Sequence, residues 1–278
     1  MEQHFYKTLW GVTNSIEESC RIAKEDNFTG IEGPAPTDPD QRDTFFETLE
    51  AHDLDWICEI TTCTPEGKFI PEPGRHFTEH LMDLEDRLVD ALPGEPRFIT
   101  TLAGADNWSY GDTIEFFLGI LNLEEGYGVP ISVETHRGRP LVSPWLTREI
   151  LNWFPQLKLT CDFSHWCVVS ERLLLDEEPK LLEQVANSAY HIHGRIGYDQ
   201  GAQVPDPRLP QYQQELDSHL NWWRAIKTAK VKQGRKTMTL TPEFGPDGYQ
   251  QIELSSGGPA TDLRELNLWM ADLLRRKL

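Results

Sequence analysis

Short apolar runs alternate with longer amphipathic segments along the whole chain. Each apolar run has the length of a buried strand, and each amphipathic segment repeats apolar residues at helical spacing. The pattern predicts strands at 9–12, 28–33, 55–61, 97–104, 130–136, 157–164, 189–195 and 237–244. It predicts helices at 15–25, 43–52, 76–92, 112–127, 145–154, 171–186, 211–229 and 262–276. This strict alternation indicates parallel strands joined by right-handed crossovers.

Eight strand–helix units in 278 residues fit an α/β fold of the (β/α)8 type, a closed TIM barrel. An open doubly wound sheet is the alternative, but no Gly-x-Gly-x-x-Gly segment follows the first predicted strand. No linker or low-complexity tract divides the chain, so residues 1–278 are expected to form a single barrel domain. Long Gly- and Pro-rich connections follow three of the strands, at 62–75, 194–211 and 245–261. Because active sites of such barrels are built from the loops after strands, these loops mark the expected functional face.

The chain is acidic, with 26 Lys and Arg against 45 Asp and Glu, a net charge of −19. A nucleic-acid partner is therefore not expected, because a polyanion would be repelled. No apolar run approaches the ~20 residues of a membrane span, so no membrane association is expected. The first residues lack a signal-peptide pattern, and the 5 cysteines are an odd number. Together these features predict a cytoplasmic enzyme with reduced thiols.

Side chains that bind metals recur near the carboxyl ends of the last four predicted strands. They are Glu134, Asp162, His191, His193 and Glu243. Glu134, Asp162 and His193 are separated by 28 and 31 residues, about one strand–helix unit each. Strand alternation predicts that Asp162 and Glu243 point into the barrel, together with Thr160, Thr239 and Thr241. Converging carboxylates would repel one another without a cation, so the pattern predicts a site for one divalent metal ion, such as Mn²⁺, Co²⁺, Mg²⁺ or Zn²⁺.

These residues resemble the site of the xylose isomerase-like barrel superfamily, in particular its sugar phosphate isomerase/epimerase and ketose 3-epimerase branch. The resemblance covers nearly the whole chain in layout, and its support lies in the segments VETHRG, CDFSHW, YHIHGR and TPEFGP. It implies that Glu134, Asp162, His193 and Glu243 hold the metal, with His193 favoured over His191. It also implies that Glu134 and Glu243 remove and return the proton.

The implied function is a metal-dependent sugar isomerase or epimerase. Such an enzyme transfers a proton through a metal-bound enediolate of a small polyhydroxylated ketose, aldose or derivative. The candidates for binding substrate oxygens are His165, His191, Arg195 and His136. Homodimers and homotetramers are common in the family, so either is an expected assembly.

Some features leave other functions open. After the seventh strand the 3-epimerases carry a Glu and then an Arg, whereas here Arg195 comes first and Asp199 follows. A dehydratase of an inosose-like substrate begins with the same deprotonation and is the alternative; a catalytically silent sugar-binding barrel is another. His76–His80 match the His-x-x-Glu-His protease pattern without further support. Glu32 and Glu59, near the ends of the second and third strands, could also face the pocket.

Overall fold

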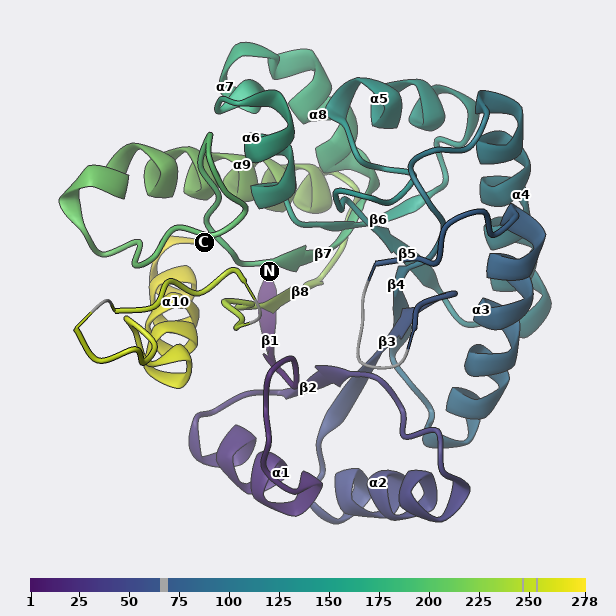
Figure 1. The fold of residues 1–278 in the computed structure, drawn as a ribbon, viewed down its shortest axis with the longest axis horizontal. Coiled ribbons are helices and arrows are strands. Elements are labelled where there is room, and N and C mark those ends of the chain that lie inside the picture. The colour runs from purple at the N-terminus through teal and green to yellow at the C-terminus, as the bar shows by residue number, and fades with distance from the viewer. Residues whose placement is uncertain (66–69, 247, 254) are drawn as a thin grey trace.

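Eight parallel strands pair in sequence order, and β8 pairs with β1, so the sheet closes into a barrel (Figure 1). The computed structural model describes residues 1–65, 70–246, 248–253 and 255–278. The strands are β1 (Glu2–Thr8), β2 (Gly30–Gly33), β3 (Asp55–Thr61), β4 (Phe98–Leu102), β5 (Ile131–Glu134), β6 (Lys158–Cys161), β7 (Ala189–His193) and β8 (Thr237–Thr241). The predicted (β/α)8 barrel is confirmed.

Helices surround this barrel (Figure 1). The α-helices are α1 (Ile16–Glu25), α2 (Pro39–Ala51), α3 (Phe77–Ala91), α4 (Tyr110–Tyr127), α5 (Pro144–Trp153), α6 (Ser164–Ser170), α7 (Leu174–Glu177), α8 (Pro179–Ser188), α9 (Gln213–Lys232) and α10 (Leu263–Lys277). Two 3₁₀ turns, η1 (Leu92–Gly94) and η2 (Pro210–Tyr212), precede β4 and α9. None of the helices among the described residues is long and apolar enough to span a membrane.

The barrel interior changes from apolar to polar along the strands. A small cluster of Tyr6, Ile57 and Phe98 fills its lower part. Above it, the Thr160 hydroxyl forms hydrogen bonds with the hydroxyls of Thr100 (2.7 Å) and Ser132 (2.8 Å). This contact across the interior confirms the predicted inward direction of Thr160. The intervening side chains, such as Leu159 and Cys161, pack outward in the apolar layer beneath the helices.

The first strand lies seven residues earlier than predicted. Residues 9–12 form a turn in which the Val12 amide donates to the Leu9 carbonyl (3.0 Å), and Gly11 has a φ of 73°. β1 instead runs from Glu2 to Thr8. The prediction was wrong because the polar residues of β1 conceal its alternation.

The predicted helix 171–186 is also wrong as a continuous helix. It is divided into α7 and α8, because Pro179 lacks an amide hydrogen and pushes Glu178 out of the helical region (φ −120°, ψ 66°). A further short helix, α6, directly follows β6 and was not predicted. The three long loops do follow β3, β7 and β8, although residues 66–69, 247 and 254 of those loops lie outside the described residues.

Candidate metal centre

Four side chains converge at the carboxyl end of the barrel. They are Glu134 on β5, Asp162 after β6, His193 on β7 and Glu243 after β8, and their ligand atoms all lie within 4.8 Å of one another. All four are buried, with exposed fractions of 2%, 0%, 1% and 7%. The structure thus brings together all four residues that the sequence proposed as ligands.

Local contacts fix the position of Asp162. Its backbone amide donates a hydrogen bond to the Thr135 hydroxyl (2.9 Å), and that hydroxyl donates to the Asp162 carbonyl (2.9 Å). The carboxylate accepts from the Ser164 amide (3.0 Å) and from the Ser164 hydroxyl. A register shift between Leu159 and Thr160 precedes this turn in the β6–β7 pairing. Such irregularities direct side chains at the rim of a barrel.

The two nitrogens of His193 have different surroundings. Nε2 lies 2.9 Å from the Glu32 carboxylate on β2. Nδ1 is buried and lies 3.1 Å from Glu243 and 3.6 Å from Glu134, without a well-aligned hydrogen bond to any of the described residues. When Nε2 donates to Glu32, Nδ1 faces the two carboxylates and can bind a metal ion in place of its proton. This is the arrangement of a histidine that binds a metal and is oriented by a carboxylate.

His191 has a different environment, although it also points into the barrel. Its Nδ1 lies 2.8 Å from the Thr239 hydroxyl, and its Nε2 lies 3.1 Å from both Glu32 and the Thr241 hydroxyl. These contacts confirm the inward direction predicted for Thr239 and Thr241. Because both nitrogens of His191 are engaged, the geometry favours His193 as the imidazole ligand.

The concentration of carboxylates alters the ionisation of the centre. Burial raises the pKa of Glu134 to about 7, although His193 opposes the shift. Burial also raises the pKa of Asp162, against the effect of the Arg195 guanidinium. For His193 burial lowers the pKa, but Glu243, Glu32 and Glu134 outweigh it and raise the pKa well above its usual value. The pocket therefore attracts positive charge, and the donor set of three carboxylates and one imidazole fits a divalent metal ion.

Glu59 on β3 faces the same charges. Burial, followed by repulsion from Glu243, Glu32 and Glu134, raises its pKa to about 8. Glu59 is also one of the residues that line a cavity of about 540 Å³ between the loops that follow β2 and β3. A largely protonated carboxyl group therefore lies beside the candidate metal centre at neutral pH.

Arg195 follows β7, and its guanidinium contacts two of the candidate ligand carboxylates. Nη2 forms an ion pair with Asp162 and lies 3.6 Å from Glu243 and 2.9 Å from His165 Nε2. The Tyr249 ring covers the guanidinium at 4.8 Å, and the Trp10 ring lies at 5.4 Å. The side chain is only 2% exposed.

The remaining two candidates for binding substrate, His136 and His165, lie in contact with their rings tilted by 48°. The rings of His136 and His165 have centroids 3.8 Å apart, and both side chains are buried. Burial, together with the nearby Arg195, lowers both pKa values well below the usual value, so both imidazoles are neutral. His136, His165 and Arg195 form one polar wall of the site, whereas His191 lies deeper in the barrel.

No model of a known protein family and no curated protein matches this sequence. Solved structures match over almost the full length. A D-allulose 3-epimerase from Methylomonas sp., in complex with D-allulose, has a TM-score of 0.63 at 13% identity, covering 100% of this chain and 98% of the other. A xylose isomerase-like TIM barrel protein from Mycobacterium smegmatis, in complex with magnesium, has a TM-score of 0.62 at 12% identity, covering 99% and 97%.

A probable 3-DHS dehydratase, AsbF, from Bacillus anthracis has a TM-score of 0.58 at 13% identity, covering 99% of both chains. The chain has the xylose isomerase-like TIM-barrel fold. At these identities the likeness establishes the fold, and structures with different activities share it.

The barrel also has residues near the candidate site that sequence reasoning missed. The Tyr249 ring lies between the guanidinium groups of Arg137 (4.9 Å) and Arg195 (4.8 Å). Arg137 directly follows His136, so the segment after Glu134 was a usable signal. Tyr249 lies eight residues beyond β8 in a long loop, where periodicity gives no direction. Of the protease-like pattern, His76 caps α3 and is exposed, whereas His80 is buried against Thr62 (2.6 Å).

Proposed function

We propose that the protein is a divalent-metal-dependent sugar isomerase or epimerase. The observation that carries this proposal is the buried cluster of Glu134, Asp162, His193 and Glu243, with Nδ1 of His193 directed at two of the carboxylates. The substrate class is a small polyhydroxylated ketose, aldose or derivative. The epimerase in complex with D-allulose and the barrel in complex with magnesium support both parts of the proposal.

Glu134 and Glu243 are the proposed acid–base pair. A divalent ion held by the four residues would polarise a substrate carbonyl and so acidify the neighbouring C–H bond. With the ion bound, one carboxylate would remove the carbon-bound proton, and the other group, as a carboxylic acid, would return a proton to the opposite face of the same carbon.

The polar wall beside this pair would hold the substrate. His136 and His165 are neutral imidazoles and can both donate and accept hydrogen bonds with hydroxyl groups. Arg195 carries a permanent charge suited to the developing oxyanion. His191 is proposed as a contact in the floor of the site, since its ring is held by Glu32 and Thr239.

Dehydration is the second candidate function, and Glu59 is the observation that favours it. After the same deprotonation, loss of a hydroxyl group requires a proton donor at the departing oxygen. A carboxyl group with a pKa of about 8 is protonated at neutral pH and can supply that proton. The similarity to a probable 3-DHS dehydratase is consistent with this alternative.

The first experiment measures metal content in the purified protein and in a Glu134→Ala/Glu243→Ala variant. About one Mn, Co, Zn or Mg per chain, absent from the variant, supports the site. Ketoses and inososes are then incubated in D₂O and followed by NMR. Deuterium at the carbon beside the carbonyl with a new epimer identifies epimerisation, and loss of water identifies dehydration. A protein that stays empty after incubation with Mn²⁺ contradicts both and favours a silent sugar-binding barrel.

The expected homodimer or homotetramer stays a prediction. Light scattering coupled to size-exclusion chromatography tests it, because a mass of one 32.0 kDa chain would contradict it.

A further inference from the structure

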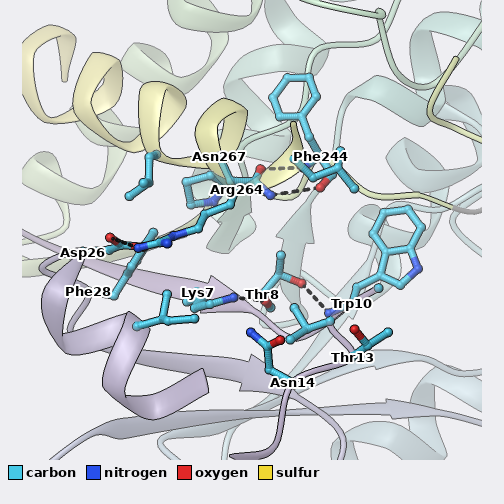
Figure 2. Close-up of a pocket in the computed structure, with 16 residues that line it drawn as sticks. Lys7, Thr8, Trp10, Thr13, Asn14, Asp26, Phe28, Phe244, Arg264 and Asn267 are labelled. Carbon is cyan, nitrogen blue, oxygen red and sulfur yellow. Dashed lines mark hydrogen bonds and ion pairs between the residues drawn. The ribbon is translucent and has the colours of Figure 1, made fainter. Parts of the chain in front are cut away.

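A second cavity lies outside the barrel wall, separate from the candidate metal centre. It has a volume of about 240 Å³ and is bounded by β1, the turn after β1, helix α1, the segment after β8 and helix α10. Figure 2 shows Arg264 and Asn267 reaching into it from α10, opposite Lys7 and Thr8 from β1. None of the four candidate metal ligands lines it.

Lys7 occupies an unusual position in this cavity. It points outward from β1, in the layer where strands place apolar side chains: Ile31, its partner in register on β2, is fully buried in the core. Among the described residues, its ammonium group makes one hydrogen bond, to the Thr8 carbonyl, at a long 3.4 Å. Burial lowers the pKa of Lys7, as expected for an ammonium group that lacks good acceptors. The cavity therefore contains an ammonium group, that of Lys7, with N–H donors that remain available to a ligand.

The nearby carboxylate does not neutralise Lys7. Asp26 accepts two hydrogen bonds from Arg264, Nε to Oδ2 at 3.0 Å and Nη2 to Oδ1 at 2.9 Å. Lys7 forms no ion pair with any of the described residues, so its ammonium group lies more than 4 Å from every carboxylate among them. The charged side chains lining the cavity, Lys7, Arg264 and Asp26, sum to +1, in a chain whose net charge is −19. One excess positive charge favours a monoanion.

The rest of the lining defines the shape of the occupant. Phe28, Ile22, Leu263 and Leu268 form an apolar wall beside Lys7. The Asn267 side chain accepts a hydrogen bond from the Phe244 amide (2.8 Å) and donates one to the Phe244 carbonyl (2.9 Å). Both polar groups of Asn267 are therefore already used by the backbone. We propose that this cavity binds a small organic monoanion, a carboxylate on a short apolar chain, whose charged group contacts the ammonium group of Lys7.

Trp10 connects this cavity with the candidate catalytic centre. It lines the cavity, and its backbone amide donates to the Thr8 hydroxyl (3.0 Å). Its ring lies 5.4 Å from the guanidinium of Arg195, which pairs with Asp162. A carboxylate bound at Lys7 therefore changes the surroundings of a tryptophan that contacts the other site. Tryptophan fluorescence reports this binding.

The test titrates butanoate into the full-length protein and follows binding by saturation-transfer NMR and tryptophan fluorescence. Lys7→Met keeps roughly the length of the side chain but removes its charge. The matched control is Lys24→Met, because Lys24 is an exposed lysine on α1 that does not line the cavity. Butanoate is expected to bind the wild type and Lys24→Met at millimolar concentrations. Binding should be about tenfold weaker in Lys7→Met, and butanamide should bind the wild type about tenfold more weakly than butanoate. The fluorescence change should vanish in Trp10→Phe.

Four results overturn the proposal. Three of them are an absence of saturable binding to the wild type, equal binding to Lys7→Met, and loss of binding in Arg195→Gln with retention in Lys7→Met. The last would place butanoate in the catalytic centre. Inorganic phosphate that binds more tightly than butanoate would also contradict a monocarboxylate site. Since the readout is binding, the result is independent of the proposed sugar chemistry.

Discussion

Replacing Glu32 is expected to weaken metal binding, although Glu32 is not one of the four candidate ligands. Its carboxylate is 1% exposed and lies 2.9 Å from His193 Nε2 and 3.1 Å from His191 Nε2. It therefore fixes the imidazole so that Nδ1 faces Glu243 and Glu134. Without it, the His193 ring can rotate or exchange the roles of its two nitrogens. Each change removes the nitrogen lone pair from the metal position.

The expected magnitude follows from the contacts that each substitution removes. Loss of a carboxylate partner behind a metal-binding histidine typically lowers metal affinity about 10- to 100-fold, or roughly 1.4 to 2.8 kcal/mol. Glu32→Gln removes the charge, but its amide oxygen can still accept from His193. We therefore expect about a tenfold loss for Glu32→Gln and about a 100-fold loss for Glu32→Ala.

The assay is calorimetric titration of metal-free protein with Mn²⁺ at pH 7, which measures affinity without turnover. The control is Glu59→Gln. The Glu59 carboxyl group is near the same centre, but within the described part of the chain it forms no hydrogen bond with His191 or His193. Because the pKa of Glu59 is about 8, this variant should change affinity less than about threefold. Unchanged affinity in Glu32→Ala, or equal losses in Glu59→Gln and Glu32→Gln, would refute the orienting role of Glu32.

Other predictions address the ligands, the metal and the ionisation of the site. Glu243→Gln and Asp162→Asn should each lower turnover at least about 100-fold with unchanged circular dichroism; wild-type rates in both would refute the site. Mn²⁺ at about 100 times its Kd should stabilise the wild type by roughly 2.7 kcal/mol, and Asp162→Asn should abolish the rise in melting temperature. The pKa of Glu59 is raised on folding, so the native state holds this proton more tightly than the unfolded state. The free energy of unfolding of the metal-free protein should therefore fall between pH 5 and pH 8, by at most about 1.4 kcal/mol per pH unit from this group. Urea unfolding should show a shallower fall in Glu59→Gln, and an identical pH profile would contradict the shift.

The fold was largely readable because apolar periodicity reflects burial. Strands in a parallel barrel are covered by helices on one face, so most of them appear as short apolar runs. β1 was the exception, since Gln3, His4 and Lys7 interrupt its pattern, and the apolar turn at 9–12 replaced it in the prediction. The interruption by Pro179 was visible in the sequence, but the length of the surrounding apolar pattern concealed it.

The sequence by itself also determined which residues could form a metal centre, because the carboxyl ends of parallel strands must meet at one end of a barrel. It could not determine what surrounds them. Glu32 contacts His193 from 161 residues away, and Tyr249 reaches Arg195 from within a loop. Lys7 faces a cavity because α10 packs beside β1. Such contacts depend on barrel closure, strand register and loop path. Periodicity gives the face on which a side chain lies, and only the tertiary structure decides which partner it meets there.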